Sequence, residues 1–332
     1  METLPFAWYT DPEILRLEQE LIFRRGWHYV GHLDQLPEIG SRLAGRAGDV
    51  PVLVLRDDAG EVRAFLNVCR HRGSVLIEGE GRGTTIQCPY HAWTYNLDGS
   101  LRAAPRADEG LDLDGLGLRP LRVQEWDRFL FVNPDPDAEA LGDLPELDLG
   151  PLRFHARVSY ALEANWKIAL ENYLECYHCP VAHKQFSAAV ETDPDTYLLE
   201  DHGSRWSQFS VARQGEGRAE FHLLWPSTKI NVYPGPANLS IGALHPDGPE
   251  RCSGFLDYFF APDLRETEIR DLFELDELVG REDRALVEAV QRGVRSGLLS
   301  HGTLMPASEQ LVAAFQHRVV ATLAPSYTAS RP

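Results

Sequence analysis

The sequence predicts an α+β protein of two domains. At 332 residues the chain is long enough to bury two cores of ordinary size. Short β-branched and aromatic runs dominate the first half, and turn pairs such as Asp98 and Gly99 separate them. The second half carries several strand patterns followed by two long helical patterns. Strands in series followed by helices favour an α+β fold with a mostly antiparallel sheet.

The first expected element is an amphipathic helix over residues 11–25, where apolar residues recur at helical spacing behind Asp11 and Pro12. We expect residues 1–38 to carry this helix and to pack with the second domain. Residues 39–140 should form an all-β domain, because their apolar runs are short and rich in β-branched and aromatic side chains. Its expected strands are residues 50–55, 62–68, 84–87, 93–95 and 129–132.

The second domain, residues 141–332, is expected to be a sheet with helices against it. A strand pattern at 156–162 precedes an expected helix over 165–178, whose apolar side chains fall on one face. Turns rich in proline and glycine divide the strand patterns that follow. The further expected strands are residues 205–211, 221–233, 237–244 and 252–260, and the expected helices are residues 263–297 and 307–321.

Charge and hydrophobicity narrow the function classes. The formal net charge of -18 repels phosphate backbones and anionic lipids, so we expect no nucleic-acid partner and no membrane partner. No apolar run approaches the roughly 20 residues of a membrane span, and residues 1–11 lack the pattern of a signal peptide. These features predict a cytoplasmic location.

The five cysteines form a poor disulfide framework, because their number is odd and small for the chain. Metal binding is the expected role for some of them. Cys176 and Cys179 form a Cys-x2-Cys that is compatible with a redox pair or a zinc site, but we interpret both as buried small residues. Cys252 has no partner at a useful spacing and is interpreted as structural.

The strongest site pattern is formed by Cys69, His71, Cys88 and His91. Each cysteine comes at the end of an expected strand, and a histidine follows it two or three residues later. Two loops can therefore turn these side chains toward one point. A tetrahedral zinc site is the main alternative, but zinc sites more often pair like ligands. A [2Fe-2S] cluster explains the mixture, because the cysteines can bind one iron and the histidines the other. The neutral histidines would raise the reduction potential, so that the cluster can accept an electron from a ferredoxin or flavin donor.

A second group of metal-binding side chains centres on His178 and His183. In a regular helix these two would point about 140° apart, and Pro180 between them is expected to break the turn so that both converge. A carboxylate should complete a two-histidine, one-carboxylate iron site with an open face. We predict Asp283 as this ligand and not Glu282, which falls about 100° away toward the polar side. Asp283 lies in helical register with the apolar residues Leu286, Val287, Val290 and Val294, where an unbound acid is costly.

These patterns resemble the Rieske non-heme iron oxygenase family over nearly the whole chain. Residues 69–73, Cys-Arg-His-Arg-Gly, and 88–99, Cys-Pro-Tyr-His-Ala-Trp-Thr-Tyr-Asn-Leu-Asp-Gly, are similar to its Rieske domain, except that Ala92 stands where many members have Gly. The spacing acid-x2-His-x4-His that ends at His183, with a later Asp, is similar to its catalytic domain. The resemblance implies an all-β Rieske [2Fe-2S] domain beside a helix-grip catalytic domain, arranged head to tail in a homotrimer.

The resemblance also implies roles for single residues. Glu175 would link His178 to a histidine of the Rieske cluster in a neighbouring subunit. Asn172 would lie near the iron, although a helix-stabilising polar contact explains it equally well. Electrons from a separate reductase or ferredoxin would reach the cluster and then Fe(II), which activates O2, and NAD(P)H and flavin would act only through that reductase. Hydroxylation, dihydroxylation or oxidative demethylation of a small organic substrate would follow.

The substrate stays open between N-methylated or quaternary ammonium compounds and aromatic rings. Glu175 stands where ring-hydroxylating dioxygenases usually have Asp, and Glu is more usual among enzymes similar to choline, glycine betaine and carnitine monooxygenases. This favours the ammonium class. Aromatic residues in the expected strands can cage a cation, line an aromatic-ring pocket or form the sheet core. They are Trp206, Phe209, Phe221, Trp225, Tyr233, Tyr258 and Phe259.

Functions of other classes remain as alternatives. A Rieske electron-transfer protein without oxygenase activity would not need the second iron site, and a zinc hydrolase with a structural zinc module would hold no cluster. Arg70 and Arg72 either form a basic docking site for an acidic electron donor or pair with neighbouring carboxylates.

Overall fold

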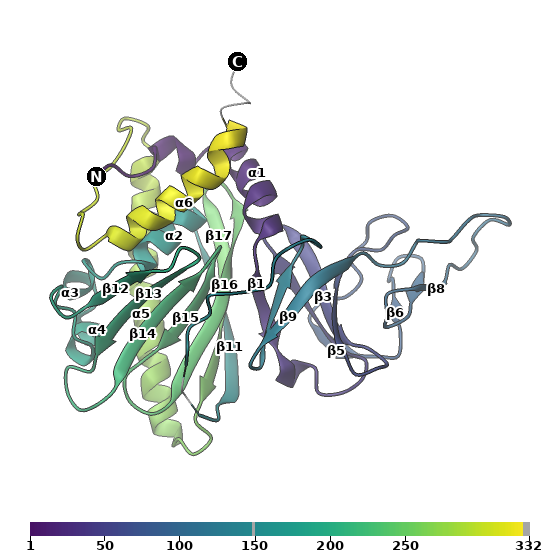
Figure 1. Cartoon of the computed structure of the whole chain (residues 1–332), viewed down its shortest axis with the longest axis horizontal. Helices are drawn as coiled ribbons and strands as arrows, with labels where there is room; N and C mark the ends of the chain where they lie inside the picture. The colour runs from purple at the N-terminus through teal and green to yellow at the C-terminus, as the bar shows by residue number, and fades with distance from the viewer. Residues whose placement is uncertain (148–149, 328–332) are drawn as a thin grey trace. The chain divides into compact units, whose positions relative to one another are not determined.

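The computed structural model describes residues 1–147 and 150–327, and the chain divides into two compact units (Figure 1). The C-terminal unit combines Met1–Ile22 with Gly142–Pro332, and the inserted unit is Phe23–Leu141. The expected segment 1–38 is therefore split, because His28–His32 is a buried strand of the inserted unit's sheet. Residues 148–149 and 328–332 of the expected second domain lie outside the described residues.

The inserted unit is built of antiparallel strands, as the sequence predicts. One sheet has the order β1-β10-β9-β4-β3-β2-β5, and a smaller one has the order β6-β7-β8. Strands β2 and β9 were not expected, because charged side chains interrupt their apolar pattern. The strands are β1 His28–His32, β2 Ser41–Ala47, β3 Val50–Arg56, β4 Val62–Leu66, β5 Glu80–Arg82, β6 Ile86–Gln87, β7 Thr94–Tyr95, β8 Leu101–Ala103, β9 Pro120–Trp126 and β10 Phe129–Asn133, with the 3-10 helices η2 Phe23–Arg25 and η3 Leu33–Gln35.

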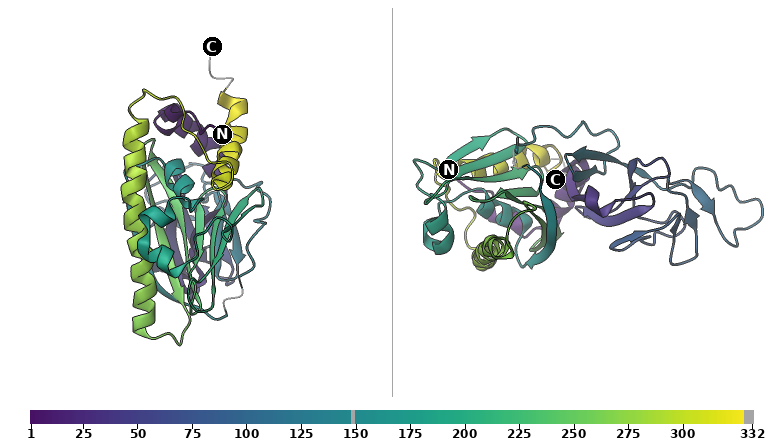
Figure 2. Two further views of the ribbon diagram at one scale, coloured as in Figure 1. Left: turned by 90° about the vertical axis from the view of Figure 1, so that its left-hand side faces the viewer. Right: turned by 90° about the horizontal axis from the view of Figure 1, so that it is seen from below.

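The C-terminal unit is a seven-stranded antiparallel sheet with helices against it, in the order β11-β17-β16-β15-β14-β13-β12. Its strands are β11 Arg153–Leu162, β12 Leu198–Asp201, β13 Arg205–Val211, β14 Arg218–Leu224, β15 Thr228–Val232, β16 Asn238–Gly248 and β17 Arg251–Phe260. Its helices are η1 Phe6–Tyr9, α1 Pro12–Leu21, α2 Trp166–Tyr173, α3 Cys179–Ala182, α4 Lys184–Ala189, α5 Glu266–Val294 and α6 Gln310–Tyr327. Helix α5 runs along one face of the sheet (Figure 2). Among the described helices, none combines the length and apolarity that crossing a membrane requires.

Two expected elements of this unit are interrupted. The helix expected over residues 165–178 ends at Tyr173, and the chain is non-helical until α3 begins at Cys179. Pro180 therefore stands in the first turn of a helix, where its missing N–H costs nothing, and the prediction that it breaks a helix was wrong. The strand expected over 221–233 is two strands, because a turn at Pro226 separates β14 from β15.

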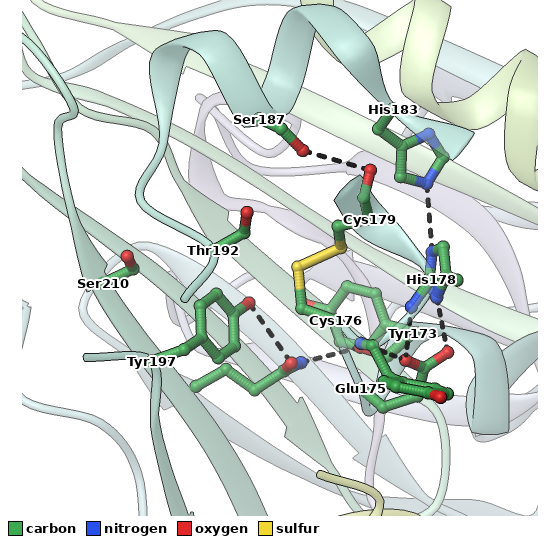
Figure 3. Close-up of a disulfide and its surroundings, with 12 residues drawn as sticks. Tyr173, Glu175, Cys176, His178, Cys179, His183, Ser187, Thr192, Tyr197 and Ser210 are labelled. Atoms are coloured by element: carbon green, nitrogen blue, oxygen red, sulfur yellow. Dashed lines mark hydrogen bonds and ion pairs between the residues drawn. A yellow bond between two sulfur atoms is a disulfide. The ribbon is translucent and has the colours of Figure 1, made fainter. Parts of the chain in front are cut away.

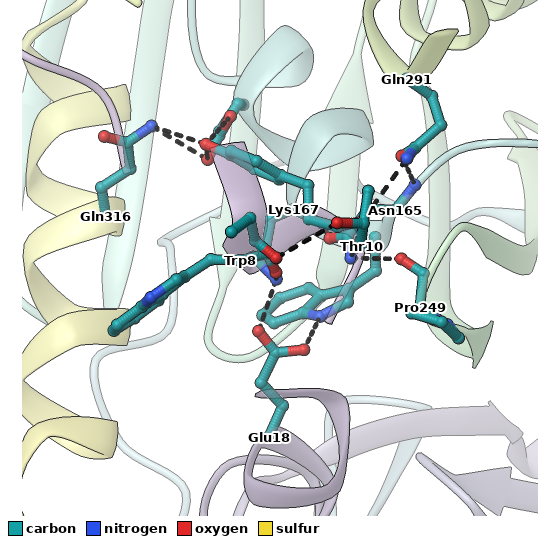
Figure 4. Close-up of polar contacts among 12 residues, drawn as sticks. Trp8, Thr10, Glu18, Asn165, Lys167, Pro249, Gln291 and Gln316 are labelled. Carbon is teal, nitrogen blue, oxygen red and sulfur yellow. Dashed lines mark hydrogen bonds and ion pairs between the residues drawn. The ribbon is translucent and has the colours of Figure 1, made fainter. Parts of the chain in front are cut away.

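A buried ion pair fastens helix α1 to helix α2 (Figure 4). Lys167 Nζ donates to Glu18 Oε1 at 2.5 Å and to the Trp8 carbonyl at 3.0 Å. The other carboxylate oxygen of Glu18 accepts from Trp166 Nε1 at 2.7 Å. Burial raises the pKa of Glu18, and the lysine opposes this shift. Both charges are thus paired and hydrogen-bonded, as full burial requires.

Lys167→Met is expected to lower the free energy of unfolding of the C-terminal unit by about 3–5 kcal/mol, because it leaves Glu18 buried without its partner. Urea unfolding followed by far-ultraviolet circular dichroism measures this change. The double variant Lys167→Met, Glu18→Leu should recover most of the loss, since it removes both charges. A double variant as unstable as the single one would contradict this explanation.

A second carboxylate, Glu171 on α2, lies close to this ion pair. It accepts hydrogen bonds from the Tyr9 hydroxyl at 2.9 Å and from Gln316 Nε2 at 3.0 Å. Burial raises the pKa of Glu171 to about 7, although both hydrogen bonds oppose the rise. An acid in the unfolded chain titrates near pH ~4.3, so the folded state holds this proton over a wider pH range.

The stability of the C-terminal unit should therefore fall as the pH rises from about 4.5 to about 7, because the folded state retains a proton at Glu171 that the unfolded chain has released. The full effect is at most about 3 kcal/mol and is complete above the raised pKa. Unfolding free energies across this window measure it. Glu171→Gln should remove this part of the pH dependence, and an unchanged slope in the variant would assign it to other groups.

Candidate metal centres

Two loops of matching backbone geometry carry the first candidate centre. In the first loop the Gly73 N–H donates to the Cys69 carbonyl at 3.1 Å, and in the second the Ala92 N–H donates to the Cys88 carbonyl at 3.1 Å. Gly73 and Ala92 both have positive φ, at 74° and 57°. This left-handed conformation costs an alanine roughly 1–2 kcal/mol. Ala92, the departure from the family pattern, therefore strains the second loop without changing a candidate ligand.

The four predicted cluster ligands lie together in these loops. The Cys69 and Cys88 side chains are buried in one core cluster. His71 is exposed and His91 is half-buried, and the centroids of their rings lie 4.6 Å apart. His91 Nδ1 is buried and has no hydrogen-bond partner among the described residues. A buried imidazole nitrogen without a hydrogen-bond partner, in a loop that also carries a buried thiol, fits the two-sulfur, two-nitrogen ligand set of a Rieske-type [2Fe-2S] cluster.

The surroundings favour the ligating forms of these side chains. Burial opposes ionisation of Cys88, but the backbone N–H groups of Tyr90 and His91 outweigh it and lower the pKa of this thiol. Burial, and next the nearby His71, lower the pKa of His91. A thiolate and a neutral imidazole are the forms that bind metal. The loops are therefore suited to a cluster before any metal arrives.

The second candidate centre brings together side chains that are about 100 residues apart in the sequence. His183 Nε2 lies 3.0 Å from His178 Nε2 and 3.0 Å from Asp283 Oδ1. His178 Nε2 lies 3.4 Å from the same carboxylate oxygen. One ligand atom from each residue falls within 4.8 Å of the others. Three electron-donating atoms that converge on one point fit the two-histidine, one-carboxylate set of a mononuclear iron site.

The other nitrogen of each imidazole contacts a glutamate. His178 Nδ1 bonds to the Glu175 carboxylate, and His183 Nδ1 lies 2.8 Å from Glu282 Oε2. A carboxylate on the far nitrogen fixes the orientation and tautomer of a metal-binding histidine. Helical periodicity predicted Glu282 on the polar side of its helix and gave no sign of this contact. An acid directly before the predicted ligand was the signal that could have identified it.

The apolar stripe on which Asp283 was predicted to lie is only partly present. Val287 is buried, whereas Leu286 and Val290 are 37% and 50% exposed. Asp283 faces the centre even so, because helix α5 turns it toward the two histidines. Hydrogen bonds to these histidines outweigh burial and lower its pKa to about 2. Asp283 therefore presents an anionic oxygen, the form that binds a metal cation.

A cavity of about 330 Å³ adjoins this centre. Asn172 lines it and its Nδ2 lies 3.5 Å from His178 Nε2, so the structure places this predicted residue beside the histidines. Of the aromatic residues singled out in the sequence, Phe221, Tyr233 and Tyr258 line the cavity. Trp206 and Trp225 do not line it and instead pack against the Phe315 ring.

Cys176 and Cys179 form a disulfide in the segment between Glu175 and His183 (Figure 3). Both side chains are buried, as expected, but their interpretation as free small residues was wrong. The bond closes a short ring that contains His178. The spacing Cys-x2-Cys had offered a redox pair as an alternative, and the fold brings the two sulfurs together because the chain turns sharply into α3.

Two family models match the chain: the Rieske [2Fe-2S] domain over residues 26–126 and the ring hydroxylating alpha subunit (catalytic domain) over residues 149–213 and 199–324. The chain therefore belongs to the Rieske non-heme iron oxygenases, with a Rieske [2Fe-2S] cluster and a mononuclear iron as cofactors. The predictions of family, fold class and enzyme class are confirmed. The match to the catalytic domain argues against an electron carrier and a zinc hydrolase.

Among its relatives, the chain is 34% identical to the carnitine monooxygenase oxygenase subunit of Acinetobacter pittii, over 96% of this chain and 94% of that protein. It is 33% identical to the chloroplastic choline monooxygenase of Arabidopsis thaliana, over 90% of this chain and 78% of that protein. A crystal structure of the quaternary ammonium Rieske monooxygenase CntA matches with a TM-score of 0.87 and 32% identity, over 97% of this chain and 95% of that one. The expected terminal oxygenase with a preference for quaternary ammonium compounds agrees with these relatives.

Proposed function

We propose that this oxygenase hydroxylates or oxidatively demethylates an N-methylated or quaternary ammonium compound. The observation that carries the proposal is a cavity that joins the two candidate iron-binding histidines to aromatic side chains. Phe221, Tyr233 and Tyr258 line this cavity, and aromatic rings attract an alkylated ammonium by cation-π interaction. The names of the choline and carnitine monooxygenases among the relatives support the same substrate class.

In this proposal the cluster ligands lie in the inserted unit and the ligands of the mononuclear iron lie in the C-terminal unit. Cys69, Cys88, His71 and His91 hold the cluster, and His178, His183 and Asp283 hold the iron. When bound, these centres supply the electron transfer and oxygen activation by which one atom of O2 enters a substrate C–H bond and the other leaves as water, with two electrons and two protons consumed. A hydroxylated N-methyl group then releases formaldehyde and a proton, leaving the demethylated amine.

The chain's own residues position the reaction. Glu175 and Glu282 orient the two histidines through their Nδ1 atoms. Asn172 lines the cavity with its Nδ2 3.5 Å from His178 Nε2, and in this proposal it contacts the bound substrate. The cavity lining excludes bulk water once the substrate fills it, which strengthens electrostatic contacts to the substrate.

We also propose a homotrimer in which Glu175 connects the iron site to the cluster of a neighbouring subunit. Tyr177 and Val181, next to the Glu175 and His178 pair, are 61% and 78% exposed, and Tyr90 beside the cluster loop is 57% exposed. Exposed large apolar side chains at both candidate centres suit an interface between copies. Size-exclusion chromatography with light scattering tests this assembly.

The electron donor in this proposal is a separate reductase or ferredoxin in the cytoplasm, and NAD(P)H and flavin act only through it. Arg70 and Arg72 are exposed beside the cluster loop. Neither forms an ion pair with a carboxylate in the part of the chain that the structure describes, and the Arg72 guanidinium lies 5.3 Å from the centre of the Tyr90 ring. This favours a docking role for the two arginines on a chain with a net charge of -18.

Aerobic product analysis with a surrogate reductase tests the proposed function. The substrate panel contains methylated amines, quaternary ammonium compounds and aromatic acids. We expect oxygen consumption coupled to product only with the ammonium compounds, and formaldehyde where an N-methyl group is oxidised. A cis-diol from an aromatic acid would instead establish ring dihydroxylation.

A further inference from the structure

The cavity contains a cation that belongs to the chain itself. Lys229 on β15 lines it, and its Nζ lies 5.1 Å from the centre of the Tyr160 ring and 5.3 Å from that of the Tyr173 ring. The sequence has only three lysines. Lys167 forms a buried ion pair with Glu18, and the exposed Lys184 donates a hydrogen bond to the Pro180 carbonyl. Of the three lysines, Lys229 is therefore the one that lines the cavity.

Lys229 carries its charge without a carboxylate partner. Burial favours the neutral amine, but Tyr160, Asp276 and, more weakly, Asp283 outweigh it and raise the pKa of Lys229. Within the described residues no carboxylate forms an ion pair with its Nζ. Arg281 and Arg284 also line the cavity, but both are exposed. Lys229 is thus the interior positive charge of this site, and an ammonium in such a position needs an anion to offset its desolvation.

The cavity also has an interior negative charge that is already well hydrogen-bonded. Asp276 on α5 accepts a hydrogen bond from the Tyr233 hydroxyl at 2.5 Å and another from the Tyr258 hydroxyl. Both tyrosines are among the aromatic residues proposed to contact the substrate ammonium. A carboxylate behind two aromatic rings makes that part of the cavity attractive to a cation. The lining therefore carries an anionic group that is already hydrogen-bonded and a cationic group to which the described part of the chain supplies no carboxylate in an ion pair.

We infer, on the basis of the proposed ammonium substrate, that the substrate is a zwitterion and that Lys229 binds its carboxylate. A monocation such as choline would meet the Lys229 charge inside the cavity, where like charges repel each other more strongly than in bulk water. A carboxylated quaternary ammonium compound would pair with Lys229 at one end and with the aromatic rings at the other. Lys229 is in this view the residue that determines specificity between the two kinds of ammonium compound.

Equilibrium binding to the intact oxygenase tests the inference without turnover. Isothermal titration calorimetry compares carnitine, γ-butyrobetaine and glycine betaine with choline, for the unchanged chain and for Lys229→Met, which keeps the side-chain length but not the charge. Lys229→Met should weaken binding of the carboxylated compounds about thirtyfold or more, as truncation of one partner of a buried charge pair does, and should leave choline binding equal or stronger. Lys229→Arg keeps the charge and should keep the preference for a carboxylate.

Arg270→Met is the matched control, because it removes one positive charge from α5 at an exposed position outside the cavity lining. It should change none of the affinities. If Lys229→Met reduces the affinity for choline and for the carboxylated compounds alike, or for neither, Lys229 does not select a carboxylate and the inference fails, while the ammonium class stands. If no ammonium compound binds to the unchanged chain, the proposed function fails together with the inference.

Discussion

Replacing His183 by alanine is expected to abolish substrate-coupled oxygen consumption and to leave the cluster in place. His183 Nε2 lies 3.0 Å from both other candidate ligand atoms, so its loss removes the centre of the proposed iron site. Metal analysis should find a fall from about three irons per chain to about two, with acid-labile sulfide unchanged. The electron paramagnetic resonance signal of the reduced cluster should persist.

His202→Ala is the matched control for this experiment. His202 belongs to the same unit, is partly exposed and contacts Glu200 at 3.1 Å, outside the cavity lining. This variant should retain both its iron and its activity. Product formation by His183→Ala at the rate of the unchanged protein would exclude His183 from the iron site.

Glu175→Gln is expected to give the second largest loss, a decrease of more than about 100-fold in the rate of product formation with iron content retained. The amide keeps the size of the side chain but loses the carboxylate that bonds to His178 Nδ1. Loosening of a metal-binding histidine alone costs about 10–100-fold. A larger decrease is expected because Glu175 is also the proposed link to the neighbouring cluster. Single-turnover product yield and stopped-flow reoxidation of the reduced cluster measure the two effects separately.

Glu282→Gln is the informative comparison, since Glu282 holds the other histidine through the same kind of contact at 2.8 Å. This variant should lose about 10–100-fold in rate through orientation alone, with cluster reoxidation slowed no further than product formation. Equal rates of cluster reoxidation in the two variants would show that Glu175 acts only by orienting His178. The proposed electron route through Glu175 would then be wrong.

The parts of the fold that sequence could predict are those whose signal is local. The cluster loops are recognisable because Cys69, His71, Cys88 and His91 fall within a short stretch and each loop supplies two candidate ligands. The sheets and the long helix α5 follow from periodicity, which depends on near neighbours in the chain. The ends of these elements were predicted less well. Helix α2 ends at Tyr173 and not at residue 178, because the end of a helix depends on tertiary contacts as well as on the local sequence.

The features that sequence could not predict depend on residues that are distant in the chain. Glu282 looks like a surface acid until the fold brings His183 to it, across 99 positions. Lys229 stands in a strand pattern with nothing nearby in the sequence to mark it, and only the tertiary structure places its ammonium beside two tyrosine rings. The Cys176 and Cys179 pairing required the chain to turn between them, whereas the helix expected over residues 165–178 would have included Cys176 and the two residues after it.

The contacts of α1 bear on how the protein matures during synthesis. The segment Met1–Ile22 leaves the ribosome before the inserted unit, whereas its partner Lys167 emerges only after the whole of Phe23–Leu141. The inserted unit can therefore complete its sheet before α2, which carries the partner of Glu18, has been synthesised. A fragment that starts at Gly142 would keep Lys167 and lose Glu18, and so would carry an uncompensated interior charge. Production of the C-terminal unit by itself therefore requires that the segment Met1–Ile22, which contains α1, be joined to Gly142.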